Sequence, residues 1–217
     1  MEKIYYPSCK LMAGFPATAQ AASDYMEQCQ GASIGKCCRD EETKASSDEV
    51  AVFNCNTCGI FLNEWSDADS VLSIYELLDQ DKSYSFPDHY GKRMAVQDCW
   101  RSIDRPELQQ AIRSLLTKMG IEIVELAESG KDSTFCGEFL MMPMPPYYLE
   151  YAPRRFGKDL PDWVFQEVEP EERAAKMKAH AAAIPVDDVV CNCMGCVLGI
   201  NTGGKHAVHI LELVFGT

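Results

Sequence analysis

Cysteine is the residue type in this sequence whose number and spacing could do chemistry. The chain has 217 residues and 11 cysteines. A first set comprises Cys9, Cys37, Cys38, Cys55 and Cys58. Soft thiolate ligands select zinc, copper(I) or iron–sulfur clusters, and four of them complete a zinc site or a cubane cluster. A fifth thiolate, together with the adjacent pair Cys37-Cys38, therefore indicates a larger metal assembly.

A second set of cysteines lies later in the chain. It comprises Cys99, Cys136, Cys193 and Cys196. Four ligands fit structural zinc as well as an iron–sulfur cluster, so the sequence leaves both open for this second site. Cys191 lies two residues before Cys193 and would point the same way on a continuing strand, which makes it a candidate fifth ligand. Cys29 belongs to neither set, and we expect it to be a buried thiol.

The two sets follow the same order, which indicates an internal duplication. In each half a strand ends at a cysteine, a polar loop carries one or two more, an apolar strand runs into CxxC, and an apolar segment follows. The matched features are Cys9 with Cys99, Cys37-Cys38 with Phe135-Cys136, Cys55/Cys58 with Cys193/Cys196, and residues 71–78 with 208–214. We therefore divide the chain into two cysteine-rich halves, residues 1–85 and 86–217.

Alternating strand and helix patterns predict an α/β fold, with a short parallel sheet and flanking helices in each half. The expected strands are Lys3–Tyr6, Ala51–Asn54, Met94–Gln97, Glu122–Leu126 and Asp188–Val190. The clearest expected helices are Pro106–Met119 and Glu171–Ala183. Ligands of open α/β sheets bind where the strands end, so we expect each half to gather its cysteines at that edge.

Composition narrows the function further. Apolar residues make up 47% and charged residues 24% of the chain, which is globular composition, and the net charge is −13. Nucleic acid and anionic membranes are repelled by that charge, so neither is an expected partner. We find no apolar run long enough to span a bilayer and no signal peptide at the N-terminus. We therefore expect a soluble, cytoplasmic protein with thiols rather than a disulfide framework.

The repeated order of one cysteine, a Cys-Cys pair and CxxC resembles the cysteine-rich CCG domain. This domain occurs in the catalytic subunit of heterodisulfide reductases and in related iron–sulfur oxidoreductases. The resemblance covers nearly the whole chain, and it implies that Cys9, Cys37, Cys38, Cys55 and Cys58 hold a noncubane [4Fe–4S] cluster. The chain departs from the family pattern at Arg39, where a glycine is usual, and at Phe135-Cys136, where the cysteine pair is reduced to one.

The resemblance implies disulfide and thiol redox chemistry on a small substrate. The sequence contains no ferredoxin-type cysteine run and no GxGxxG turn, so the electrons must come from an iron–sulfur or flavoprotein partner. Lys10, Arg39 and Arg101 lie beside candidate ligands, where they could offset cluster charge or bind an anionic substrate. Two alternatives remain: a non-catalytic electron-transfer or assembly subunit with structural metal sites, and a double zinc module that binds a protein.

Overall fold

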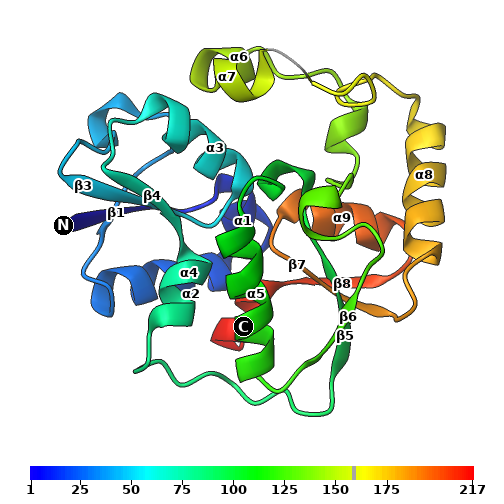
Figure 1. Cartoon of the computed structure of the whole chain (residues 1–217), viewed down its shortest axis with the longest axis horizontal. Coiled ribbons are helices and arrows are strands. Elements are labelled where there is room, and N and C mark those ends of the chain that lie inside the picture. Colours follow the sequence, from blue (N-terminus) through cyan, green and yellow to red (C-terminus); the bar gives the residue numbers. More distant parts are fainter. Residues whose placement is uncertain (158–159) are drawn as a thin grey trace. The chain divides into compact units, whose positions relative to one another are not determined.

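Two parallel sheets form the framework of the described part of the chain, residues 1–157 and 160–217 of the computed structural model (Figure 1). The strand order is β2-β1-β3-β4 in the first sheet and β6-β5-β7-β8 in the second. The strands are β1 (Glu2–Tyr6), β2 (Ser33–Ile34), β3 (Glu49–Phe53), β4 (Ser70–Ser73), β5 (Arg93–Gln97), β6 (Glu122–Glu125), β7 (Asp188–Cys191) and β8 (His206–His209). The predicted α/β class and the repeated halves are thereby confirmed.

Helices and short 3₁₀ turns connect these strands. The helices are α1 (Cys9–Gly14), α2 (Pro16–Gln28), α3 (Asn56–Trp65), α4 (Ile74–Gln80), α5 (Pro106–Lys118), α6 (Tyr147–Tyr151), α7 (Pro153–Phe156), α8 (Pro170–Ala182), α9 (Met194–Thr202) and α10 (Ile210–Phe215). The 3₁₀ turns are η1 (Glu41–Thr43), η2 (Trp100–Ser102), η3 (Gly130–Asp132) and η4 (Phe139–Met141). The two helices predicted most clearly are α5 and α8.

The sequence predicted the central strands but missed three at the sheet edges. All five expected strands are present, each shifted by at most two residues at either end. The missed strands β2, β4 and β8 have only two to four residues each and carry serine or histidine. Edge strands are covered on fewer sides than central ones, so they do not need the apolar runs by which strands are recognised.

Strand order sets the place where a ligand can bind. In the first sheet the chain runs from β1 to β2 on one side, and later from β3 to β4 on the other side. Right-handed crossovers in opposite directions leave a crevice at the carboxyl ends of the central pair, the switch point where α/β proteins bind ligands. The second sheet has the same switch point between β5 and β7.

Contacts within the chain define two units. Unit 1 comprises Met1–Asp81, the helices α6 and α7, and Thr217, and unit 2 comprises the remaining described residues from Lys82 to Gly216. The sequence repeat was divided at residues 85 and 86, so α6 and α7 lie inside its second half. They pack with unit 1 because their aromatic side chains surround Phe61 of α3. Among the described residues, no helix is long and apolar enough to cross a membrane.

Candidate metal centres

Each half places its CxxC turn where a central strand meets a helix. Cys55 follows β3 and is the N-cap residue of α3, and Cys193 follows β7 and is the N-cap residue of α9. The second cysteine of each pair, Cys58 or Cys196, lies in the first helical turn. The predicted gathering of cysteines at the carboxyl edge of each sheet is therefore present in both units.

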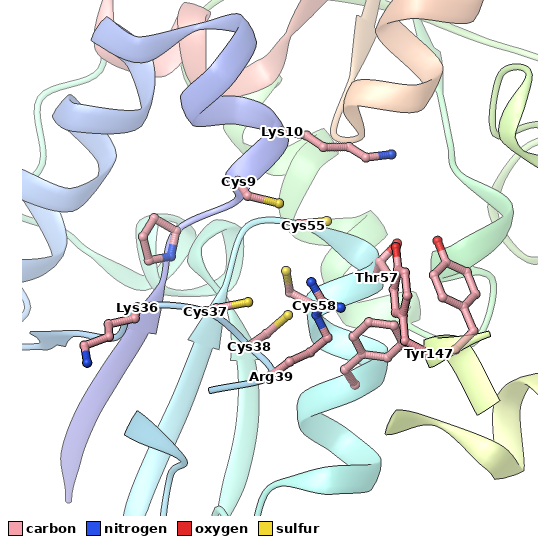
Figure 2. A pocket seen from close by; sticks show the side chains of 13 residues that line it. Cys9, Lys10, Lys36, Cys37, Cys38, Arg39, Cys55, Thr57, Cys58 and Tyr147 are labelled. Carbon is pink, nitrogen blue, oxygen red and sulfur yellow. The ribbon is translucent and has the colours of Figure 1, made fainter. Parts of the chain in front are cut away.

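All five cysteines of the first set line one pocket of unit 1 (Figure 2). The chain segments that carry them are the start of α1, the loop after β2, and the turn from β3 into α3. Figure 2 shows the sulfurs of Cys9, Cys37, Cys38, Cys55 and Cys58 facing a common space. The cavity has a volume of about 80 Å³. The adjacent thiols of Cys37 and Cys38 thus line the same pocket.

The five thiols differ in exposure and in their affinity for protons. Cys38 and Cys58 are buried, Cys37 and Cys55 are half-buried, and Cys9 is exposed. A hydrogen bond from the Cys58 side chain lowers the pKa of Cys55 to about 6, against the opposing effect of burial. Hydrogen bonds with Cys38 and Cys55, followed by burial, raise the pKa of Cys58. Burial also raises the pKa of Cys9. Cys55 is therefore set up to ionise before Cys58 and Cys9.

Cationic side chains line part of the same pocket. Lys10, Lys36 and Arg39 all belong to its wall. Lys36 forms an exposed ion pair with Glu42. Arg39 hydrogen-bonds to Cys37, and its guanidinium lies 4.4 Å from the centre of the Tyr147 ring. The sequence placed Lys10 and Arg39 near the first site, and the structure puts both on its wall.

Aromatic side chains form another part of the wall. Tyr147 and Tyr148 of α6 line the pocket together with Phe61 of α3. Their rings meet the Phe61 ring edge to face, with centroid distances of 6.1 and 5.4 Å. These tyrosines lie far from the first cysteine set in the sequence, and nothing in the repeat pattern pointed to them. The one signal in the sequence of their segment is its run of methionine, proline and tyrosine, residues 141–148.

A carboxylate fixes this aromatic wall to α3. The Glu64 side chain accepts hydrogen bonds from the backbone N–H groups of Arg154 and Arg155, each at 2.8 Å. Its side chain is only 7% exposed. The two donors belong to the first turn of α7, where backbone N–H groups lack partners within the helix. Glu64 therefore attaches α7 to the helix that carries the CxxC turn.

The second set of cysteines forms a closed cage in unit 2. The sulfurs of Cys99, Cys136, Cys193 and Cys196 all lie within 4.8 Å of one another. The Cys99 and Cys136 sulfurs are 3.4 Å apart, and those of Cys136 and Cys193 are 3.9 Å apart. Three of the four thiols are buried, and Cys193 is half-buried. Among the described residues this is the one group with such spacing, so the first pocket is the wider of the two sites.

Hydrogen bonds and burial shift the pKa values of the cage thiols. Contacts with the thiols of Cys193, Cys196 and Cys99 lower the pKa of Cys136 well below its ordinary value. Burial raises the pKa of Cys99 and of Cys196. Arg101 is 3% exposed, and its Nε–H donates to the Cys136 sulfur at 3.2 Å. The structure therefore places Arg101 against the cage and away from solvent.

Two further cysteines lie outside both groups. Cys191 is buried on β7 and pairs in register with Gln97 of β5, and its sulfur is not among the four of the cage. Its counterpart in the first half is Phe53, an apolar position of the core, and burial raises the pKa of Cys191. Cys29 is exposed at the end of α2, so the expectation that it is buried was wrong.

The donor sets fit metal binding by soft ions. Four mutually close thiols suit a tetrahedral metal ion or a small cluster. Five thiols spread around a wider pocket exceed what one tetrahedral ion can use, and the exposed Cys9 lies toward solvent. The arrangement thus defines an α/β protein with two thiolate-rich centres, one closed and one open.

Comparisons with known proteins do not identify a family for this chain. No known protein family has a sequence profile that matches the chain, and no curated protein is similar to it in sequence. One solved structure, glutamate racemase isoform RacE1 from Bacillus anthracis, aligns with 99% of this chain and 78% of its own. The identity is 11% and the TM-score is 0.34, values too low to carry an argument about fold or function.

Proposed function

We propose that this protein is a cytoplasmic iron–sulfur oxidoreductase subunit of the heterodisulfide-reductase type, with its redox site in the first pocket. The observation that carries the proposal is the convergence of five thiols from three segments on one partly open pocket. A structural zinc site is complete with four ligands and needs no opening. The additional thiol and the opening are what a larger, substrate-accessible metal centre requires.

The residues that would hold a noncubane [4Fe–4S] cluster are Cys9, Cys37, Cys38, Cys55 and Cys58. Such a cluster supplies one-electron redox chemistry beside a disulfide that enters the pocket. The overall reaction adds two electrons and two protons to a disulfide and yields two thiols. An iron–sulfur or flavoprotein partner would deliver the electrons, as the absence of a second redox motif in the sequence suggests.

The surrounding residues would tune and shape the site. Lys10 and Arg39 lie on the pocket wall, where positive charge offsets the negative charge of a thiolate-ligated centre and raises its potential. Phe61, Tyr147 and Tyr148 exclude water from one side, which strengthens the electrostatic effect of those cations. Arg39 would also attract an anionic substrate group, because its guanidinium lies on the pocket wall, 4.4 Å from the centre of the Tyr147 ring.

Anaerobic metal analysis and spectroscopy test this proposal. We expect brown protein with about four irons at the first site, and loss of that iron and its sulfide in Cys38→Ala. The matched control is Cys29→Ala, which removes an exposed thiol that does not line the pocket. An added disulfide should change the electron paramagnetic resonance spectrum of the wild-type protein. Colourless protein, or iron and sulfide contents that are the same in Cys38→Ala as in the wild-type protein, would overturn the proposal.

The second candidate is a non-catalytic electron-transfer or assembly subunit. The closed second cage favours it, because a buried centre can pass electrons or hold structure without meeting a substrate. The same spectra separate the two functions. A relay centre should keep its signal unchanged when thiols or disulfides are added, whereas an open centre should not.

A further inference from the structure

The second cage has the dimensions of a site for a single metal ion. Its four sulfurs lie within 4.8 Å of one another, and two of the separations are 3.4 and 3.9 Å. A zinc ion with Zn–S bonds of about 2.3 Å and tetrahedral angles holds its sulfurs about 3.8 Å apart. The separations in the cage therefore bracket the value that one tetrahedral ion requires.

The same dimensions exclude a cubane cluster. In a regular tetrahedron with 4.8 Å edges, the upper limit of the cage, the centre lies about 2.9 Å from each sulfur, which leaves room for one ion with bonds of about 2.3 Å and not for a core of several atoms. A [4Fe–4S] core contains eight heavy atoms, and each thiolate lies outside a different corner of it. The four sulfurs of the cage would have to move apart to admit such a core.

We propose that the second cage binds one zinc ion as a structural site, independently of the redox function proposed for the first pocket. Zinc accepts four thiolates in closed tetrahedral geometry and needs no open position. The cage offers four thiols, none of them exposed, and no histidine or carboxylate among its described members. The ion would join three segments of unit 2: the turn after β5, the loop at Cys136, and the start of α9.

Two donors support the charge of this site. Four thiolates and one Zn²⁺ carry a net charge of −2, which is costly to bury without compensation. The Arg101 Nε–H donates to the Cys136 sulfur at 3.2 Å, and the Arg101 backbone N–H donates to the Cys99 sulfur at 3.4 Å. Partners of this kind orient metal ligands and stabilise them as anions. Arg101 is therefore a positioning residue of the zinc site rather than a substrate-binding residue.

The test uses the full chain with the first pocket disabled, so that any metal left belongs to the cage. In Cys38→Ala/Cys58→Ala we expect about one zinc per chain, no acid-labile sulfide, and an X-ray absorption spectrum with four sulfurs at about 2.3 Å. Adding Cys136→Ala should remove the zinc. Adding Cys191→Ala instead should leave it in place, because this buried cysteine lies two residues from Cys193 but outside the cage.

Each outcome bears on one proposal at a time. Iron and sulfide that persist in Cys38→Ala/Cys58→Ala, or a zinc shell with fewer than four sulfurs, would overturn the zinc assignment and leave the redox proposal standing. If Cys136→Ala fails to fold, the absorption spectrum of the parent variant still decides the ligand set. Arg101→Met should weaken zinc retention against a chelator about tenfold, by the usual effect of losing such a partner. Unchanged retention would remove Arg101 from the site.

Discussion

The two halves of this chain place the same turn at the same sheet edge, yet one forms an open pocket and the other a closed cage. Cys55 and Cys193 are equivalent N-cap residues, and each helix brings its second cysteine into the first turn. The strand orders around them are also equivalent. The difference must therefore come from the residues that surround the thiols rather than from the fold.

Glycines close the second site. A Cβ atom on Gly137 would collide with the carbonyl oxygen of Gly195, so the Cys136 loop rests directly on the backbone of α9. The equivalent residues in the first half are Arg39 and Thr57, which carry side chains where the second half has glycines, and both line the first pocket. We infer that these side chains keep the first loop away from its helix, so that the thiols of the first half line a wider space.

A stacked aromatic pair occupies the place of the fifth thiol in the second half. Phe135 stands where the first half has Cys37, and its ring stacks on that of His180 with a centroid distance of 3.9 Å. His180 is held in turn by a 2.6 Å hydrogen bond to the side chain of Gln97. The second half thus has core packing at the position where the first half has Cys37, and four thiols line its cage.

The largest expected effect follows from Gly137→Ala. Gly137 has a φ of +59°, and the added methyl would collide with Gly195. Backbone strain and overpacking together should cost about 4 kcal/mol of unfolding free energy and release the zinc ion that we propose for the cage. Urea unfolding and metal content measure both effects.

Gly204→Ala is the matched control for this variant. Gly204 also has a positive φ, +93°, but nothing lies within 4 Å of the position of its missing Cβ. It should lose only about 1 kcal/mol and keep its metal. Equal losses of unfolding free energy in the two variants would mean that the cost comes from backbone strain at a positive φ. The contact between the Cys136 loop and α9 would then not be what holds the cage closed.

A smaller loss is expected from Asp98→Ala. The Asp98 side chain is 2% exposed and accepts hydrogen bonds from Arg113 and from the backbone N–H of Gly130, each at 2.7 Å. The strand register places Pro7 at this position in the first half, and the match of Cys9 with Cys99 places Ser8 there. Neither residue is charged, so the network belongs to the second half alone. Removing one partner of a buried ion pair should cost about 3 kcal/mol in thermal or urea unfolding.

Glu122→Ala removes an exposed partner, that of Arg93, and serves as the control for Asp98→Ala. Surface pairs of this kind contribute under about 1 kcal/mol. A loss as small in Asp98→Ala would show that the turn bearing Cys99 does not depend on its buried charge.

The sequence predicted the cysteines at the strand ends because apolar strands and CxxC turns are local patterns. It could not predict that the first site is open and the second closed, because that depends on contacts between Gly137 and Gly195, 58 positions apart. The aromatic wall was missed for the same reason, since Tyr147 follows the second cysteine loop in the chain but lines the first pocket. Arg101 was recognised as a neighbour of the ligands, but its burial against Cys136 required the fold.

At pH 5 the protein should lose about 2 kcal/mol of unfolding free energy through a histidine cap of the second half that the first half lacks. His209 caps α10 where Ser73 caps α4, and burial lowers its pKa to about 4. An unfolded histidine has a pKa of about 6.5, so between these values the unfolded chain binds the additional proton. The contribution is complete above about pH 6.5 and is lost as the pH falls toward 4. In His209→Ser, which adopts the cap of the first half, this loss should vanish.

Unfolding free energies of both proteins at pH 7.5 and pH 5 test this prediction. Subtracting one from the other cancels the acid sensitivity of the thiolate sites, which both proteins share. Parallel curves would contradict the prediction, because they would mean that His209 is protonated at no cost in the folded protein.

The smallest effect concerns the wall of the open pocket, which has no counterpart in the cage. The Arg39 guanidinium lies 4.4 Å from the Tyr147 ring centre and 5.8 Å from that of Tyr151. A cation at this distance from an aromatic face contributes about 0.5–1 kcal/mol at a partly exposed site. A double-mutant cycle with Arg39→Met and Tyr147→Leu should give a coupling energy of that size, and the cycle with Tyr151→Leu a smaller one. Zero coupling to Tyr147 would mean that Arg39 widens the pocket by its bulk alone, and that its charge remains fully available to the thiolates.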